Sequence, residues 1–278
     1  MKVSHIWQYP VKSMVGVTVD SCDVSELGIV GDRHWAVRDM ERGGIRGAKR
    51  IGDLMQFSAQ PVADGTRHVR ITLPNGNTGL SSDADVNERL SESLGMKVAL
   101  ESLPADNNEE HFRRGPAYSD DTMEELRGVF GRDPDEPLPD FSVFPPVIAE
   151  FESPLGTHYD CWPLMVMTTS ALEAMKSALP NSVIDWRRFR PSIVIDGAEP
   201  GHPEFGWKGK TARIGSAVVE FLDPCPRCVM PTRRINDDVP EDRSILRHIV
   251  RELDQNLGVY ARVAHPGVIS IGDDIHFQ

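Results

Sequence analysis

A pair of cysteines, Cys225 and Cys228, lies in the segment FLDPCPRCVMPTRRIN at residues 221–236, which also holds three arginines. Cysteines at this spacing form half of a zinc site, a redox dithiol or a disulfide, and a single one can act as a reactive thiolate. A guanidinium group beside a thiol favours the thiolate, which soft metals prefer as a ligand. The arginines therefore favour one cysteine as a metal ligand at the end of a strand.

Other interpretations of the pair remain open at this point. A structural zinc site needs four ligands, but the chain has no second such pair, and His202, His248 and His265 are not spaced as zinc ligands. A redox dithiol normally places its first cysteine at a helix N-terminus, and Pro231 makes a helix after Cys228 awkward. Buried cysteines also pack as small apolar side chains without any chemistry.

The composition limits the kind of protein. The chain has 278 residues and a formal net charge of −12 at pH 7, which suits one large domain or two smaller ones. The charge argues against general nucleic-acid binding and against an anionic membrane surface. No apolar run approaches the roughly 18–20 residues of a membrane helix, and the N-terminus lacks the apolar stretch of a signal peptide. Four cysteines favour a reducing compartment, so we expect a cytoplasmic protein.

The elements that position these residues are mostly strands in the first third of the chain. Residues 1–103 contain apolar, alternating stretches separated by turn residues, including an Asn-Gly turn. A short helix is expected over residues 83–95, closed by Gly95. Residues 104–150 are rich in Pro, Asp and Glu, and we interpret them as a long connection with a helical turn or two near 121–130.

Strands and helices alternate in residues 151–278. A buried strand leads into a helix over 162–181, and a later strand ends at the cysteine pair. The stretch 242–258 is amphipathic, and its apolar face holds Ile245, Leu246, Ile249 and Leu253. The whole pattern predicts an α+β protein that is dominated by strands and is barrel-like.

Four segments in this order resemble the MOSC domain family, whose fold is shared with the C-terminal part of molybdenum-cofactor sulfurases. They are YPVKSM with GIVGDRHWAV, then FRPSIVIDG, PCPRCVMPT and GVYARVAHPGVISIGD. The resemblance implies a MOSC-type β-barrel core with flanking helices at 151–278, preceded by a β-barrel-like domain at 1–103. It does not extend over the connection at 104–150. It is strongest to the amidoxime-reducing members of the family and their bacterial counterparts.

The resemblance implies a molybdenum cofactor, in which a molybdopterin dithiolene and one protein cysteine hold the metal. The family's ligand matches Cys228, which becomes the metal ligand and catalytic residue, while Cys225 becomes a structural neighbour. The pterin carries a phosphate, which needs fixed cations and N–H donors. The residues expected to bind the cofactor are Lys12, Ser13, Arg33, Asp160, Arg188, Arg190, Ser192, Arg227 and Thr232.

The chain departs from the family pattern at several positions. Ser192 replaces the family's Asn, and Pro231-Thr232 replaces Thr-Thr. Lys49 stands in the place of an arginine, and Arg234 stands where the amidoxime-reducing member has an acidic residue. These differences leave the cofactor pocket in place, but they lie where substrate-side residues are expected and leave the substrate class open.

The resemblance implies an enzyme, independent of pyridoxal phosphate, that reduces N-hydroxylated or N-oxide small molecules by oxygen-atom transfer at molybdenum. The chain lacks the C-x4-C-x2-C motif of a plant-type iron–sulfur site and a dinucleotide-binding G-x-G-x-x-G after a strand. We therefore expect electrons from a separate electron-transfer protein, and a monomer or weak dimer. The alternative is a molybdenum-cofactor carrier or sulfurtransferase-like protein that uses Cys228. A third possibility is a MOSC fold that binds another ligand without the cofactor.

Overall fold

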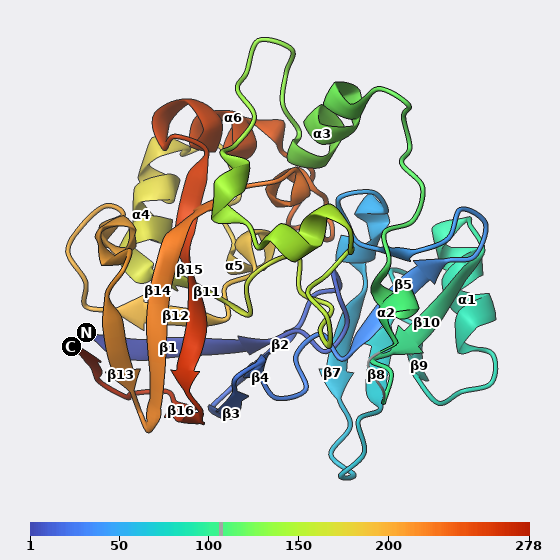
Figure 1. Cartoon of the computed structure of the whole chain (residues 1–278), viewed down its shortest axis with the longest axis horizontal. Helices are drawn as coiled ribbons and strands as arrows, with labels where there is room; N and C mark the ends of the chain where they lie inside the picture. Colours follow the sequence, from blue (N-terminus) through green and yellow to red (C-terminus); the bar gives the residue numbers. More distant parts are fainter. Residues whose placement is uncertain (106–107) are drawn as a thin grey trace.

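The computed structural model describes residues 1–105 and 108–278, and strands dominate it (Figure 1). Its largest sheet has eight strands in the order β17, β13, β14, β15, β11, β12, β1 and β2, of which β11 and β12 are parallel neighbours. In chain order these strands are β1 (Lys2–Gln8), β2 (Val17–Val19), β11 (Leu164–Thr168), β12 (Ile193–Asp196), β13 (Thr211–Ile214), β14 (Ala217–Pro226), β15 (Asn256–His265) and β17 (Ile275–Phe277).

Three further sheets have three strands each, in the orders β10–β5–β6, β16–β3–β4 and β7–β8–β9. Their strands are β3 (Ser21–Ser25), β4 (Gly28–Ile29), β5 (Trp35–Asp39), β6 (Ile45–Arg46), β7 (Ser58–Pro61), β8 (Val69–Thr72), β9 (Thr78–Leu80), β10 (Val98–Ser102) and β16 (Gly267–Ser270). The strand-dominated α+β class is confirmed. The sheets are open where the sequence predicted barrels, because no ladder in the described residues joins the first and last strand of a sheet.

The helices are short and lie around the sheets. They are α1 (Val86–Leu94), α2 (Glu109–Phe112), α3 (Thr122–Phe130), α4 (Thr169–Ala178), α5 (Trp186–Phe189) and α6 (Arg243–Glu252), with the 3-10 turns η1 (Gly52–Gln56), η2 (Phe141–Val143), η3 (Pro146–Ala149), η4 (Pro203–Trp207) and η5 (Met230–Thr232). The amphipathic pattern of α6 is confirmed, because Ile245, Leu246 and Ile249 are buried. No helix within residues 1–105 and 108–278 is long and apolar enough to cross a membrane.

The N-terminal strands share their sheets with strands from the C-terminal half. Strand β1 pairs with β12, and β3 pairs with β16. The chain ends also meet, since the backbone N–H of Ile275 donates to the carbonyl of Met1 at 3.2 Å (Figure 1). The predicted domain boundaries at residues 103 and 150 stay a prediction. The strands β1 to β4 precede these boundaries but belong to sheets that also contain strands from after them.

Three apolar cores hold these elements together, and the cysteine loop joins two of them. The first core fills the large sheet, and the second lies under the N-terminal sheets. The second core also takes Met230 and Ile235 from the segment after the cysteines, with Cys228 packed against it. Cys225 belongs to the third core, beside α4, α5 and α6. The loop between the two cysteines is therefore anchored at both ends.

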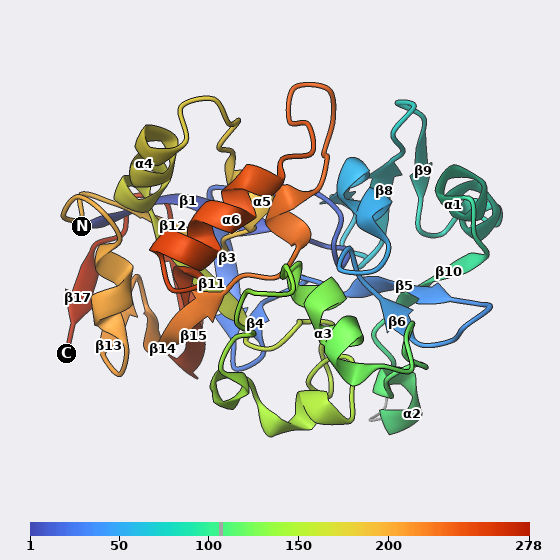
Figure 2. The same cartoon turned by 90° about the horizontal axis from the view of Figure 1, so that it is seen from above.

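Within residues 108–150 the connection is folded along one side of the molecule, at the lower edge of Figure 2, rather than extended as a simple linker. The helical turns expected near 121–130 are confirmed as α3, whose N-terminus is capped by the side chain of Asp121. The rings of Phe130, Phe141 and Phe144 pack together, with centres 5.8–6.2 Å apart. This aromatic cluster gives the segment a small core of its own.

Candidate functional site

One cavity of about 600 Å³ lies where the cysteine loop, the N-terminal loops and the 104–150 segment meet. Its size is within the range of roughly 300–1,000 Å³ that small-molecule and cofactor sites occupy. Eight of the ten residues singled out from the sequence line it: Lys12, Ser13, Arg33, Asp160, Arg190, Ser192, Arg227 and Cys228. Their cofactor-binding roles stay predictions, but the fold brings these eight side chains to one place.

The cavity is positively charged within an acidic protein. Eight of its lining residues are cationic: Lys12, Arg33, Arg46, Lys49, Arg50, Arg114, Arg190 and Arg227. Three are acidic: Glu125, Glu152 and Asp160. Such an excess of guanidinium and ammonium groups suits a ligand that carries negative charge.

Three of the predicted cofactor residues have a left-handed backbone. Ser13, Arg33 and Arg190 have φ angles of 70°, 49° and 60°, a region in which residues other than glycine are uncommon. Each such residue costs on the order of 1–3 kcal/mol, and such strain clusters at functional sites. The placement of these three side chains at the cavity therefore costs conformational free energy of the backbone.

Asp160 lies between two lysines at the cavity wall. Its Oδ1 accepts a hydrogen bond from Lys12 Nζ at 2.6 Å, and its Oδ2 lies 3.3 Å from Lys49 Nζ. Burial alone would raise the pKa of Asp160, but the charges of Lys12 and Lys49 outweigh it and hold that pKa well below its usual range. Burial lowers the pKa of Lys12, and Asp160 opposes this effect. The carboxylate therefore helps to keep two ammonium groups charged.

Two histidines, His111 and His158, contact each other beside Lys12. The Nε2 atoms of His111 and His158 lie 2.9 Å apart, and His158 Nδ1 lies 3.1 Å from the carbonyl oxygen of Arg33. Because a carbonyl only accepts, Nδ1 of His158 donates, and neutral His158 then accepts at Nε2 from His111. The carbonyl of His158 accepts from Lys12 Nζ at 2.7 Å. Burial and the charge of Lys12 lower the pKa of His158 well below its usual value.

This histidine pair predicts acid-sensitive stability. His158 is neutral in the folded protein at pH values where it is charged in the unfolded chain, so its contribution is complete above the unfolded pKa of about 6.5 and is lost as the pH falls below it. We expect the thermal midpoint to fall between pH 7 and pH 5, and to fall less steeply in His158→Gln. The exposed His265 offers the matched control His265→Gln. Equal slopes for the wild type and His158→Gln would contradict the prediction.

Arg33 is held between two tyrosine rings. Its guanidinium carbon lies 5.0 Å from the ring centres of both Tyr9 and Tyr159, and its Nη1 pairs with Asp32. Asp32 Oδ1 also accepts from the backbone N–H of Tyr9 at 2.6 Å. Burial raises the pKa of Asp32, and the charge of Arg33 opposes it. The rings and the carboxylate together fix one guanidinium at the cavity.

Arg190 and Arg227 are buried arginines, and each has a guanidinium nitrogen without a hydrogen-bond partner. Arg190 Nη1 donates to the carbonyl of Met14 at 2.5 Å, and its guanidinium carbon lies 4.1 Å from the ring centre of Tyr9. Burial and then the charge of Arg33 lower the pKa of Arg190 to about 10. Arg190 Nη2 and Arg227 Nε have no hydrogen-bond partner, and neither residue pairs with a carboxylate in the described chain. Unpartnered buried donors are costly, which favours an anion here.

The two cysteines have different surroundings. Cys225 is buried, and its sulfur accepts a hydrogen bond from Arg227 Nη1 at 3.3 Å. Burial raises the pKa of Cys225, although Arg227 opposes this. Cys228 is half-buried and lines the cavity. Burial opposes the charge of the nearby Lys49, but Asp160 outweighs burial and raises the pKa of that lysine. Arg227 was expected to support Cys228, but its direct hydrogen bond goes to Cys225.

The two predicted serines are engaged within the protein. Ser13 Oγ accepts from the backbone N–H of Ala48 at 2.8 Å, and Ser192 Oγ accepts from that of Met165 at 3.3 Å. Each hydroxyl keeps its own proton available for a ligand.

Arg188 and Thr232 lie outside the cavity. Arg188 is completely buried, and its guanidinium donates to the carbonyls of Val183, Pro231, Arg233 and Pro240. Thr232 Oγ1 donates to the carbonyl of Val229 within the turn η5. Both residues therefore fix the chain that follows the cysteines, and the ligand contact predicted for them stays a prediction.

Sequence reasoning left several lining residues out of the predicted set. Lys49, together with Arg46 and Arg50, belongs to the cation-rich stretch IRGAKRIG, which is a visible signal. Cys161 follows Asp160, and burial raises the pKa of its thiol to about 12. The 104–150 segment adds an apolar wall that no motif marked: Leu126, Val129, Phe130, Phe141, Phe144, Pro145, Pro146, Ile148 and Ala149.

The fold and the cavity define a β-rich protein in which a cysteine pair faces clustered cations. The chain belongs to the MOSC domain family: the family model of the MOSC N-terminal beta barrel domain matches residues 1–112, and that of the MOSC domain matches residues 156–276. It is 26% identical to the mitochondrial amidoxime-reducing component 1 of Xenopus laevis, over 99% of this chain and 81% of that protein. It is 23% identical to the mitochondrial amidoxime reducing component 2 of Rattus norvegicus, over 99% and 82%.

A solved structure also resembles the chain. The YUAD protein from Bacillus subtilis gives a TM-score of 0.46 at 11% identity, over 99% of this chain and 94% of that one.

Proposed function

We propose that the chain is a molybdenum-cofactor-dependent oxidoreductase that reduces N-hydroxylated or N-oxide compounds with electrons from a separate protein. One observation carries the proposal: a single cavity joins Cys228 to eight cationic side chains in a protein of net charge −12. Membership of the MOSC family and the names of the amidoxime-reducing relatives support the same conclusion.

The residues of the cavity suit an anionic pterin cofactor. The cavity holds a thiol on its wall, and a thiolate is the ligand that soft metals prefer. The unpartnered N–H groups of Arg190 and Arg227 can donate to an anion without breaking an existing ion pair. In this arrangement Cys228 would ligate the metal, Lys12 and Arg33 would bind the phosphate, and Arg190 would contact the pterin.

When bound, the cofactor would supply two-electron oxygen-atom transfer at molybdenum, while the protein supplies binding, orientation and electrostatics. The net reaction removes the oxygen of an N–O group with two electrons and two protons, and water is released. Asp160 keeps Lys12 and Lys49 charged, and Tyr9 and Tyr159 hold Arg33 in place. These contacts fix the cations before any ligand arrives, which limits reorganisation on binding.

The apolar wall is the part of the cavity best suited to the body of the substrate. Phe130, Phe141 and Phe144 come from the 104–150 segment, and Trp162 is held nearby by a hydrogen bond from Nε1 to the carbonyl of Val143 at 2.9 Å. Apolar lining with a few polar groups is typical of small-molecule sites.

The test is metal analysis of the protein from a host that makes the cofactor, with pterin fluorescence and turnover of an amidoxime under a chemical reductant. We expect close to one molybdenum per chain, a pterin signal in the same fraction, and conversion to the amidine. Folded protein without molybdenum would overturn the proposal. A persulfide on Cys228 with no reductase turnover would overturn it in favour of the sulfur-handling alternative.

A further inference from the structure

Arg132 is a buried arginine that the proposed chemistry does not use. It is 5% exposed and has no carboxylate partner among the ion pairs of the described residues. Burial lowers its pKa to about 10. A guanidinium buried without an acidic partner is expensive. Its position therefore needs a reason beyond packing.

The guanidinium of Arg132 binds the backbone directly before Cys228. Its Nη2 donates to the carbonyl of Arg227 at 3.0 Å, which belongs to the peptide bond that leads into Cys228. The backbone N–H of the same Arg227 donates to the carbonyl of Gln255 at 2.8 Å. Both polar groups of this residue's backbone are thereby held from outside the cysteine loop.

Gln255 closes the arrangement from the other side. Its Oε1 accepts from both Nε and Nη2 of Arg132, at 3.2 and 3.0 Å. Gln255 is 8% exposed and has a φ of 71°, so its backbone is itself strained. One side chain and one carbonyl of Gln255 thus connect Arg132 and Arg227 in a small closed network.

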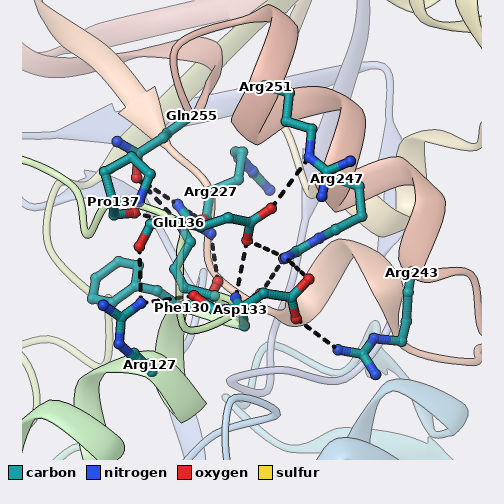
Figure 3. A network of polar contacts seen from close by, with 12 residues as sticks. Arg127, Phe130, Asp133, Glu136, Pro137, Arg227, Arg243, Arg247, Arg251 and Gln255 are labelled. Atoms are coloured by element: carbon teal, nitrogen blue, oxygen red, sulfur yellow. Dashed lines mark hydrogen bonds and ion pairs between the residues drawn. The ribbon is translucent and has the colours of Figure 1, made fainter.

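Ion pairs hold the segment around Arg132 in place. Figure 3 shows Asp133 and Glu136 facing Arg247, Arg243 and Arg251 of α6. Arg247 bonds to both carboxylates, and Glu136 is 5% exposed. The guanidinium of Arg132 is therefore presented from a rigid support rather than from a free loop.

The segment that supplies Arg132 lies between the two family domains. The family models match residues 1–112 and 156–276, so residues 113–155 belong to neither match. The cysteine loop lies within the second match. The bond to the Arg227 carbonyl therefore joins the MOSC domain match to a segment that lies outside both matches.

We propose that Arg132, together with Gln255, is a positioning residue for Cys228, fixing the peptide that carries the proposed metal ligand. The expected effect of Arg132 on metal affinity rests on the proposed function, whereas its effect on the order of the cysteine loop does not. Loss of outer-shell partners of metal ligands typically costs 10–100-fold in metal affinity. Substitution of Arg132 is expected to act in that range.

The test uses the full chain and compares Arg132→Met with Arg127→Met. Arg127 comes from the same segment and donates to the carbonyls of Asp133 and Glu136, but makes no bond to the cysteine loop. In the metal-free protein, we expect Arg132→Met to speed amide hydrogen exchange about tenfold in the peptide that carries Cys228, since the bond to the Arg227 carbonyl is lost. Arg127→Met is expected to leave that peptide unchanged, and exchange in α4 should be unchanged in both.

A second pair of variants separates positioning from general stability. Gln255→Glu keeps an acceptor for Arg132 and should retain slow exchange, whereas Gln255→Leu should reproduce Arg132→Met. In cofactor-loaded protein, the Mo(V) magnetic resonance signal should shift in Arg132→Met and not in Arg127→Met, because it reports the thiolate ligand. Unchanged exchange in Arg132→Met, or equal changes in both arginine variants, would overturn the inference. If Arg132→Met speeds amide exchange in the Cys228 peptide but the wild-type chain never binds molybdenum, the proposed function is refuted and the inference about Arg132 stands.

Discussion

Cys228→Ser is expected to fold normally but to purify without molybdenum and without reductase activity. At neutral pH a serine hydroxyl keeps its proton and is a hard ligand, whereas a soft metal needs the thiolate. Since even outer-shell groups contribute 10–100-fold to metal affinity, removal of the ligand should lower bound molybdenum at least about tenfold. Cys228 is half-buried and serine is slightly smaller than cysteine, so the thermal midpoint should change little. Metal content per folded chain and calorimetry measure the two effects.

Cys225→Ser is the matched control for this prediction. Cys225 is buried in the third core, where Arg227 donates to its sulfur. A serine oxygen keeps that acceptor but is more polar than sulfur, so we expect a loss of stability of about 1–2 kcal/mol with most of the molybdenum retained. Equal loss of metal in both variants would contradict the asymmetry, as would molybdenum retained in Cys228→Ser.

Arg33→Met is expected to remove both cofactor retention and a large part of the stability. The Asp32 side chain is completely buried, and the Arg33 side chain is 14% exposed. Removal of one partner of a buried pair leaves an uncompensated charge and typically costs about 3–5 kcal/mol. The free energy of unfolding from denaturant titration measures this loss, and metal analysis measures retention.

The double variant Asp32→Asn/Arg33→Met separates the two roles of Arg33. Asparagine keeps an oxygen for the backbone N–H of Tyr9, which Asp32 Oδ1 accepts at 2.6 Å, but it carries no charge. We expect the double variant to recover much of the stability lost in Arg33→Met while still failing to retain molybdenum. Retention of the metal in the double variant would show that Arg33 acts only through stability.

Ordered motifs made much of the site predictable. Lys12, Arg33 and Arg190 lie in three separate segments, and the fold brings all three to the cavity beside Cys228. Arg188, chosen by the same reasoning, lies outside the cavity. The run DWRRFR offers three similar arginines, and only the helical turn α5 and the left-handed Arg190 decide which one faces the cavity.

Other parts of the site depend on contacts that no local pattern encodes. Arg132 reaches Gln255 across 123 positions of the chain, and neither residue lies in a motif. The aromatic wall could be anticipated only as packing, since Phe141 and Phe144 indicate some order without naming their partners. The open sheets likewise depend on which strands pair at their edges, which alternation of apolar residues does not determine.

The position of β1 inside the large sheet affects how the protein is made. The ribosome makes β1 long before its partner β12, because residues 9–192 lie between the two strands. Until β12 is made, only β2 lies beside β1, opposite Ile6 to Gln8, and the edge that pairs with β12 stays open although Val3 and Ile6 are buried in the finished sheet. Pairing over such long separations slows folding, and unpaired strands promote aggregation. The nascent chain is therefore most in need of chaperone protection between the synthesis of β1 and that of β12.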